Sequence, residues 1–177
     1  MSEPITGEDI ISAAEAGIPE SIAATAQLTP IEDVVLNVLR ERHPDIEFFS
    51  LIPYNQLDLI DGFVLVRRIS GNGYWSGRSH LLDSGQFLIQ VYTRDPDGDW
   101  KGAMISDGIR ASLETAGTEH KYYPGIGSIV RLRCIEEPVR KTDWITATGP
   151  VQFADLPTGF TRYESRFRIT VRPPLWG

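Results

Sequence analysis

One continuous stretch, residues 85–116, carries both a clear strand pattern and a clear helix pattern, and it constrains the fold more than any other part of the sequence. Its first half places Phe87, Ile89 and Val91 at alternate positions, which is the period of a strand with one buried face. A segment rich in Asp, with one Pro and one Gly, follows at 94–99 and is typical of a turn. The stretch therefore predicts a strand, a tight turn and a helix that form one unit.

The helix of this unit is predicted over residues 100–116, with Asp97 or Asp99 capping its first N–H groups and Gly117 ending it. The side chains that recur at the spacing of one helical face are Ile105, Ile109, Ser112, Leu113 and Ala116. Because most of these side chains are apolar, we expect this face to pack against the sheet that contains the preceding strand.

A second helix is predicted earlier in the chain, because Thr29-Pro30-Ile31-Glu32 is a capping box with proline at the first helical position. Pro44 then ends the helix, since a proline cannot continue the backbone hydrogen bonding. Its apolar face consists of Ile31, Val34, Val35, Val38 and Leu39. The pattern predicts an amphipathic helix of about three turns.

Further strands are predicted over residues 46–52, 62–69, 128–136 and 163–171. Residues 63–66 are apolar at every position, so we expect their strand to lie centrally in the sheet. In the run 128–136, Val130, Leu132 and Cys134 are expected to face inward, with Cys134 acting as a small buried apolar residue. The predicted fold class is α+β: a mainly antiparallel sheet with two amphipathic helices packed on one face, plus an extended N-terminal arm.

The arm is residues 1–28, which contain five acidic residues and no Lys or Arg, and residues 29–177 are predicted to form a single α+β domain. The net charge of −7 argues against a protein that binds nucleic acid through its phosphates. No apolar run approaches the length of about 20 residues that spans a bilayer, so no membrane contact is expected.

No spacing in the sequence is typical of a catalytic, metal or cofactor site, and we predict none of the three. Asp95, Asp97 and Asp99 match the first positions of a calcium loop, but the later Gly and Glu positions of that loop are not filled. Ser76 lacks the flanking glycines of a nucleophile elbow. The three histidines, His43, His80 and His120, have no second ligand at a suitable spacing.

Two features predict contacts with other proteins. Tyr74, Trp75 and Arg78 lie in a glycine-rich segment, and exposed Tyr and Trp residues often dominate the binding energy of an interface. Packing of these two aromatic side chains onto the domain itself is the equal alternative. Outward-facing arginines occur at alternate positions of the two late strands, namely Arg131, Arg133, Arg166 and Arg168. We expect these arginines to form a solvated or interface face, on which the acidic arm of a neighbouring subunit is the simplest partner.

The order of helix, three strands, helix and two or three strands resembles the tail terminator (tail completion) proteins of long-tailed bacteriophages. The resemblance covers about residues 29–174 and has no diagnostic motif. The segments that carry it are Phe63-Val64-Leu65-Val66-Arg67-Arg68-Ile69-Ser70-Gly71, Gln90-Val91-Tyr92-Thr93, Ile109-Arg110-Ala111-Ser112-Leu113 and residues 167–172.

The resemblance implies a non-enzymatic virion protein, assembled in the host cytoplasm. Such a protein forms a ring, typically of six subunits, at the head-proximal end of the tail tube. The ring ends tube growth, binds the tail tube protein and the head–tail connector or stopper, and lets DNA pass through its lumen without specific binding. Two alternatives remain open: a head-closure or stopper protein of the neck, and a small α+β ligand-binding domain or enzyme.

Overall fold

The computed structural model describes residues 31–53, 55, 60–72, 82–124, 127–141 and 160–172, and the structural statements below concern these residues. The predicted arm of residues 1–28 and the predicted contact residues Tyr74, Trp75 and Arg78 lie outside them. The elements in chain order are α3 (Ile31–Arg42), β1 (Phe48–Phe49), β2 (Gly62–Asn72), β3 (Asp83–Arg94), α4 (Gly98–Glu119), β4 (Tyr122–Tyr123), β5 (Gly127–Lys141) and β6 (Phe160–Arg172).

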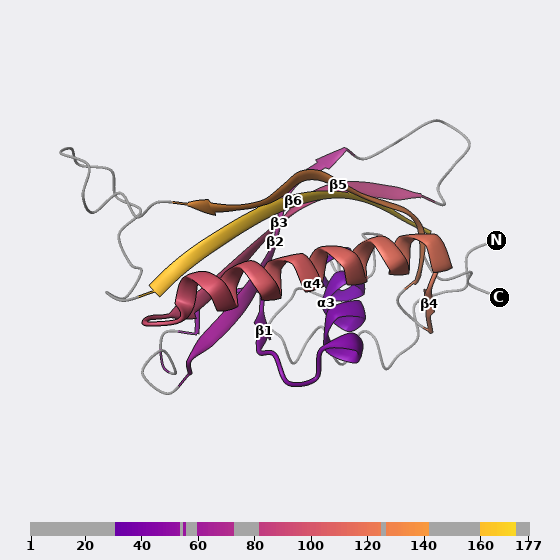
Figure 1. The fold of residues 1–177 in the computed structure, drawn as a ribbon. Helices are drawn as coiled ribbons and strands as arrows, with labels where there is room; N and C mark the ends of the chain where they lie inside the picture. The colour runs from indigo at the N-terminus through magenta and orange to yellow at the C-terminus, as the bar shows by residue number, and fades with distance from the viewer. Residues whose placement is uncertain are drawn as a thin grey trace.

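The six strands form one sheet in the order β1-β2-β3-β6-β5-β4. The short β1 pairs in parallel with β2, and every other neighbouring pair is antiparallel. The central strands β3 and β6 pair without a register shift from Asp83↔Val171 to Arg94↔Phe160. The predicted α+β class and the mainly antiparallel sheet are therefore confirmed, and Figure 1 shows the sheet curving over the helices.

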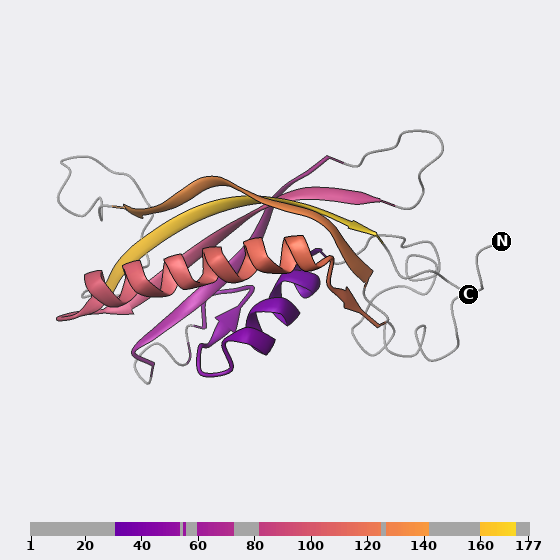
Figure 2. The same cartoon turned by 45° about the vertical axis from the view of Figure 1, so that its right-hand side comes forward.

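Both helices lie on the same side of the sheet (Figures 1 and 2). Alternation along each strand sends every second side chain to this side, where they meet the buried faces of α3 and α4. The Phe87 and Phe167 rings stack there with their centroids 5.4 Å apart. The buried members of this main cluster are Ile31, Val34, Val35, Leu36, Val38, Leu39, Phe48, Val64, Val66, Phe87, Ile89, Val91, Ile109, Leu113, Ala116, Ile129, Phe167, Ile169 and Val171.

A second, smaller cluster contains the side chains that these strands direct to the other face of the sheet. Phe63, Leu65, Tyr92 and Phe160 are its buried members, and the Phe63 and Tyr92 rings stack at 4.6 Å. The two clusters explain why residues 63–66 are apolar at every position: each face of β2 is buried. β2 is nevertheless second from the edge and not central in the strand order, and the edge strand β1 has two residues in place of the predicted 46–52.

Helix α4 differs at both ends from its predicted form. Asp97 occupies the N-cap position, but its side chain makes no capping hydrogen bond. The helix continues through Gly117 to Glu119, and His120 takes the left-handed conformation that ends it, with φ 51°. A Cβ at Gly117 would lie 3.0 Å from the Leu132 side chain, so this glycine allows α4 to approach β5 closely instead of ending the helix.

Strand β5 continues past the predicted end at residue 136 and extends to Lys141, so Val139 belongs to the strand. A register shift between Ile129 and Arg131 marks a β-bulge. Because of this bulge Ile129 is the buried residue, at 1% exposure, whereas Val130 is only half-buried. Cys134 is also half-buried, not enclosed in the core as predicted.

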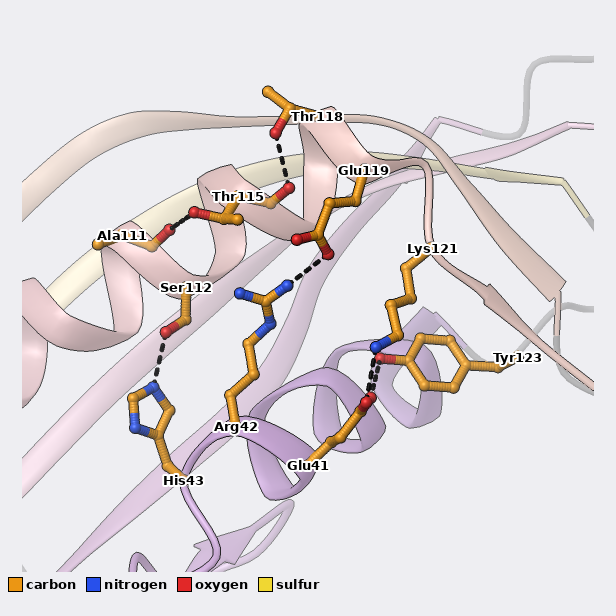
Figure 3. A network of polar contacts seen from close by, with 10 residues as sticks. All are labelled: Glu41, Arg42, His43, Ala111, Ser112, Thr115, Thr118, Glu119, Lys121 and Tyr123. Carbon is orange, nitrogen blue, oxygen red and sulfur yellow. Dashed lines mark hydrogen bonds and ion pairs between the residues drawn. The ribbon is translucent and has the colours of Figure 1, made fainter.

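Polar contacts tie the end of α3 to α4 and to the β4 region (Figure 3). His43 Nε2 and Ser112 Oγ lie 2.7 Å apart, and Arg42 forms an ion pair with Glu119. Glu41 accepts hydrogen bonds from Lys121 Nζ at 2.6 Å and from the Tyr123 hydroxyl at 3.1 Å. Each exposed pair contributes little stability alone, but together they fix the orientation of α3 on the rest of the molecule.

We expect Ile109→Asp to unfold the protein, because it places a charge at a fully buried position between α4 and the sheet. Burying an unpaired carboxylate costs several kcal/mol, on the order of the whole stability of a domain this size. The matched control is Ala111→Asp, which introduces the same charge at an exposed position of the same helix. Circular dichroism melting measures the effect, and a cooperative transition near the wild-type temperature for I109D would contradict the assigned core.

Acidification should weaken the contact between His43, at the end of α3, and Ser112 of α4. Burial, with a smaller effect of the nearby Arg42 charge, holds the pKa of His43 below its ordinary value of 6.5. The folded state therefore favours neutral His43, and the unfolded state binds more protons below about pH 6.5. Stability should fall as pH decreases through that value. Urea unfolding between pH 5 and 8 should show a weaker pH dependence for His43→Gln than for the wild type, and equal slopes would exclude His43 as the cause.

Candidate interaction surface

Strand β6 directs its two kinds of side chain to opposite faces of the sheet. Phe167, Ile169 and Val171 enter the main cluster beneath the helices. Arg166, Arg168 and Arg172 occupy the intervening positions, are exposed, and therefore lie on the face turned away from both helices. The alternation that builds the core thus also builds a row of positive charge on the outside.

The pairing of β5 with β6 adds two more arginines to this row. Arg133 is the direct cross-strand partner of Arg168, and Arg131 is the partner of Thr170. Directly paired residues point to the same face of a sheet, so the four predicted residues are brought together. The term arginine ladder is used below for these four residues, Arg131, Arg133, Arg166 and Arg168.

Most of the ladder carries uncompensated charge. Arg166 Nε lies 3.3 Å from Glu136 Oε2, in an exposed ion pair. Within the part of the chain that the structure describes, the guanidinium groups of Arg131, Arg133 and Arg168 have no hydrogen-bond or ion-pair partner. Like charges directly opposite each other destabilise a sheet. The Arg133–Arg168 pair therefore has a cost in the isolated subunit that an anionic partner would relieve.

The polar side chains next to the ladder are, by contrast, paired with one another. Ser84 Oγ and Thr170 Oγ1 lie 2.7 Å apart, and Gln90 donates to Glu164 at 2.7 Å. Gln90 also accepts from Arg67 at 2.7 Å. These hydrogen bonds cross from β2 to β6 and leave the arginine ladder as the part of this face that is available to a partner.

The helix side of the molecule has the opposite charge balance. α4 contains four acidic and two basic residues, and α3 contains three acidic and two basic residues. β6, by contrast, contains one acidic and four basic residues. The side chains of Trp100 and Met104 on α4 are 69% and 59% exposed. The two helices therefore carry a small net negative charge and exposed apolar side chains on the opposite side of the sheet from the arginine ladder, and each acidic residue of α4 forms an ion pair with a basic residue.

A shallow groove separates α4 from β5 on this helix side. Its lining residues are Ala103, Asp107, Arg110, Glu137, Pro138 and Tyr163. Arg110 pairs with Asp107 at 2.8 Å and with Glu114 at 3.0 Å, and the Tyr163 hydroxyl donates to Asp99 at 2.7 Å. That hydrogen bond, with burial, raises the pKa of Tyr163. The Tyr163–Asp99 hydrogen bond joins α4 to β6, and the two ion pairs of Arg110, both within α4, hold the polar groups of the groove in place.

The structure thus describes four of the seven predicted contact residues and places them together in the arginine ladder, while Tyr74, Trp75 and Arg78 lie outside the described residues. Sequence reasoning missed Trp100 and Met104 as surface residues. Their spacing of four on a helix, away from the apolar face that contains Ile109, was the available signal.

Metal sites and membrane-spanning helices can be considered for the described ranges of the chain. No group of three or more His, Cys, Asp and Glu residues there is arranged to hold a metal ion. None of the helices in those ranges has the length and apolar character needed to cross a membrane.

Burial raises the pKa of the Cys134 thiol, which donates to the Glu136 carbonyl oxygen at 3.2 Å.

The like-charge pair in the ladder gives a prediction with a matched control. Arg168→Glu should stabilise the isolated subunit by about 0.2–1 kcal/mol, because it places a carboxylate opposite Arg133. Arg166→Glu makes the same exchange on the same strand but places a carboxylate opposite Glu136, so it should destabilise by a similar amount. Urea unfolding at low salt measures both. Shifts of the same sign would show that the cross-strand charges do not set these energies.

No protein-family model matches this chain, and no curated protein sequence matches it significantly.

Proposed function

We propose that this chain is a structural subunit of a phage virion, which forms a ring at the head-proximal end of the tail tube. The ring ends tube polymerisation and joins the tail to the head connector. The proposal has two supports: the resemblance of the sequence to tail terminator proteins, and the division of charge between the two sides of the subunit. The proposal depends mainly on the division of charge.

Opposite charges on opposite sides of one subunit favour contacts between unlike surfaces. A two-fold contact through the arginine ladder would place arginines of two copies against each other and would be repulsive. A contact between the ladder of one copy and the acidic helix side of the next copy is attractive instead. Repeated contacts of this head-to-tail kind generate a closed ring when the rotation between neighbours closes.

The remaining parts of the proposal follow from the resemblance and the composition. The ring is hexameric, and its partners are the tail tube protein on one side and the connector or stopper protein on the other. The chain acts without a cofactor and is not an enzyme. Its net charge of −7 suits a conduit through which DNA passes without being held. The outer face of the helix layer, the segment of Tyr74, Trp75 and Arg78, and the arm of residues 1–28 supply further contacts.

The direct test adds the purified protein to a tail tube protein encoded in the same genome, while that protein is polymerising. We expect shorter tubes, each with a ring at one end, in negative-stain electron microscopy, and tubes of the tube protein alone are the control. Native mass spectrometry of detached rings gives the number of subunits. Unchanged tube lengths with no ring attached would contradict the proposal, and binding to connector rings but not to tubes would favour the head-closure or stopper alternative.

A further inference from the structure

We propose that adjacent subunits are joined by a specific pair of surfaces, in which the outer side of α4 in one copy docks on the arginine ladder of the next. This inference rests on the proposed ring and names the residues that hold it together. It concerns only residues that the structure describes.

The outer side of α4 carries a stripe of four exposed residues. Trp100, Met104, Asp107 and Ala111 recur at the spacing i, i+4, i+7 and i+11, which places them on one face of the helix. This face is turned away from the buried Ile109. The name outer stripe is used below for these four residues. An exposed Trp beside an exposed Met is a typical interface anchor, because both lose large apolar areas from water when a partner covers them.

The outer stripe and the arginine ladder are chemically complementary. A guanidinium group of the ladder can stack on the face of Trp100. It can also donate to Oδ2 of the Asp107 carboxylate, because Arg110 of the same helix donates to Oδ1. Asp97 is exposed at the same end of the helix and adds negative charge, whereas Asp99 is paired with Arg140 at 3.3 Å. On the ladder side, Val139 of β5 is 53% exposed and offers apolar surface to the stripe.

The spacings of the two surfaces also agree. One step of four residues along a helix advances about 6 Å, and one step of two residues along a strand advances about 6.8 Å. The stripe from Trp100 to Ala111 therefore has a length on the order of 16 Å. Arg166 to Arg172 on β6 covers on the order of 20 Å. Thr170 lies between Arg168 and Arg172 on β6, and Arg131 of β5 is its cross-strand partner, so the row of positive charge continues past this position. Side chains of the stripe can thus lie beside the arginines of the ladder and Arg172 without distortion of either surface.

A second copy is the occupant that the charges and positions favour. The ladder and the stripe lie on opposite sides of the sheet, so they cannot meet within one subunit. Each contact uses one ladder and one stripe and leaves one of each free at the ends of the assembly. Only closure into a ring satisfies all of them, which agrees with the proposed function.

The test uses two variants that each lose one side of the contact. Arg131→Glu with Arg168→Glu removes the ladder, and Trp100→Ser with Asp107→Asn removes the stripe. All four changed residues are exposed, so both variants should stay folded and melt within a few degrees of the wild type. The small differences expected are the gain predicted above for Arg168→Glu and the loss of the exposed Asp107–Arg110 ion pair. Each variant alone should lose association by about thirtyfold or more, as expected when anchor residues of an interface are removed. Leu51→Ser is the control, because Leu51 is an equally exposed apolar residue outside both surfaces.

Mixing the two variants gives the sharper result. One variant retains the stripe and the other retains the ladder, so an equimolar mixture should form heterodimers and nothing larger. Native mass spectrometry distinguishes these species. If the wild type assembles only on tail tubes, the same variants are compared there, and each should fail to cap tubes while L51S caps them.

Three results would overturn the inference. If the stripe variant assembles like the wild type while wild-type rings form, the docking surface is wrong although the ring function stands. If deletion of residues 1–28 abolishes assembly but the stripe variant does not, the ladder binds the acidic arm instead. If the wild type forms no oligomer either alone or on tubes, the proposed ring and this contact both fail.

Discussion

The packing of α4 on the central strands is the interaction on which the rest of the structure depends. Ile109 and Leu113 are fully buried against the layer that contains Phe87 and Phe167. A Cβ at Gly102 would lie 2.8 Å from the Tyr163 ring, so its absence lets the helix lie directly on the sheet. This close contact occupies one face of β3, β6 and β5. On the other face, the smaller cluster buries Tyr92 and Phe160, and the arginine ladder of β5 and β6 stays exposed to solvent or to partners.

The surface of the protein is a consequence of that arrangement. A strand must alternate its side chains between two faces, so each apolar residue of β6 that enters the core has an arginine beside it on the outside. The antiparallel register with β5 then sets Arg133 directly opposite Arg168. A chain with a net charge of −7 thereby acquires a locally basic face, and the acidic residues are concentrated on other parts of the chain, including α4.

Helix α4 contributes to both sides of this division. Its inner face is part of the main cluster, and its outer side carries Trp100 and Met104 beside exposed carboxylates. The same helix therefore supplies the stability of the subunit and the surface that we propose for its contacts. Substitutions on the two sides of α4 separate these roles, because inner changes act on folding and outer changes act on association.

The sequence by itself determined the α+β class, the two helices and the alternation of Phe167, Ile169 and Val171 with arginines, because each is a repeat within one local segment. Tertiary structure decided the rest. The bulge that buries Ile129 in place of Val130, and the pairing of Arg133 with Arg168, depend on the register between strands far apart in the chain. Gly117 resembles a helix end locally, but packing against Leu132 extends the helix past it. Local patterns carry no information on such contacts, since the energies that fix them come from residues distant in sequence.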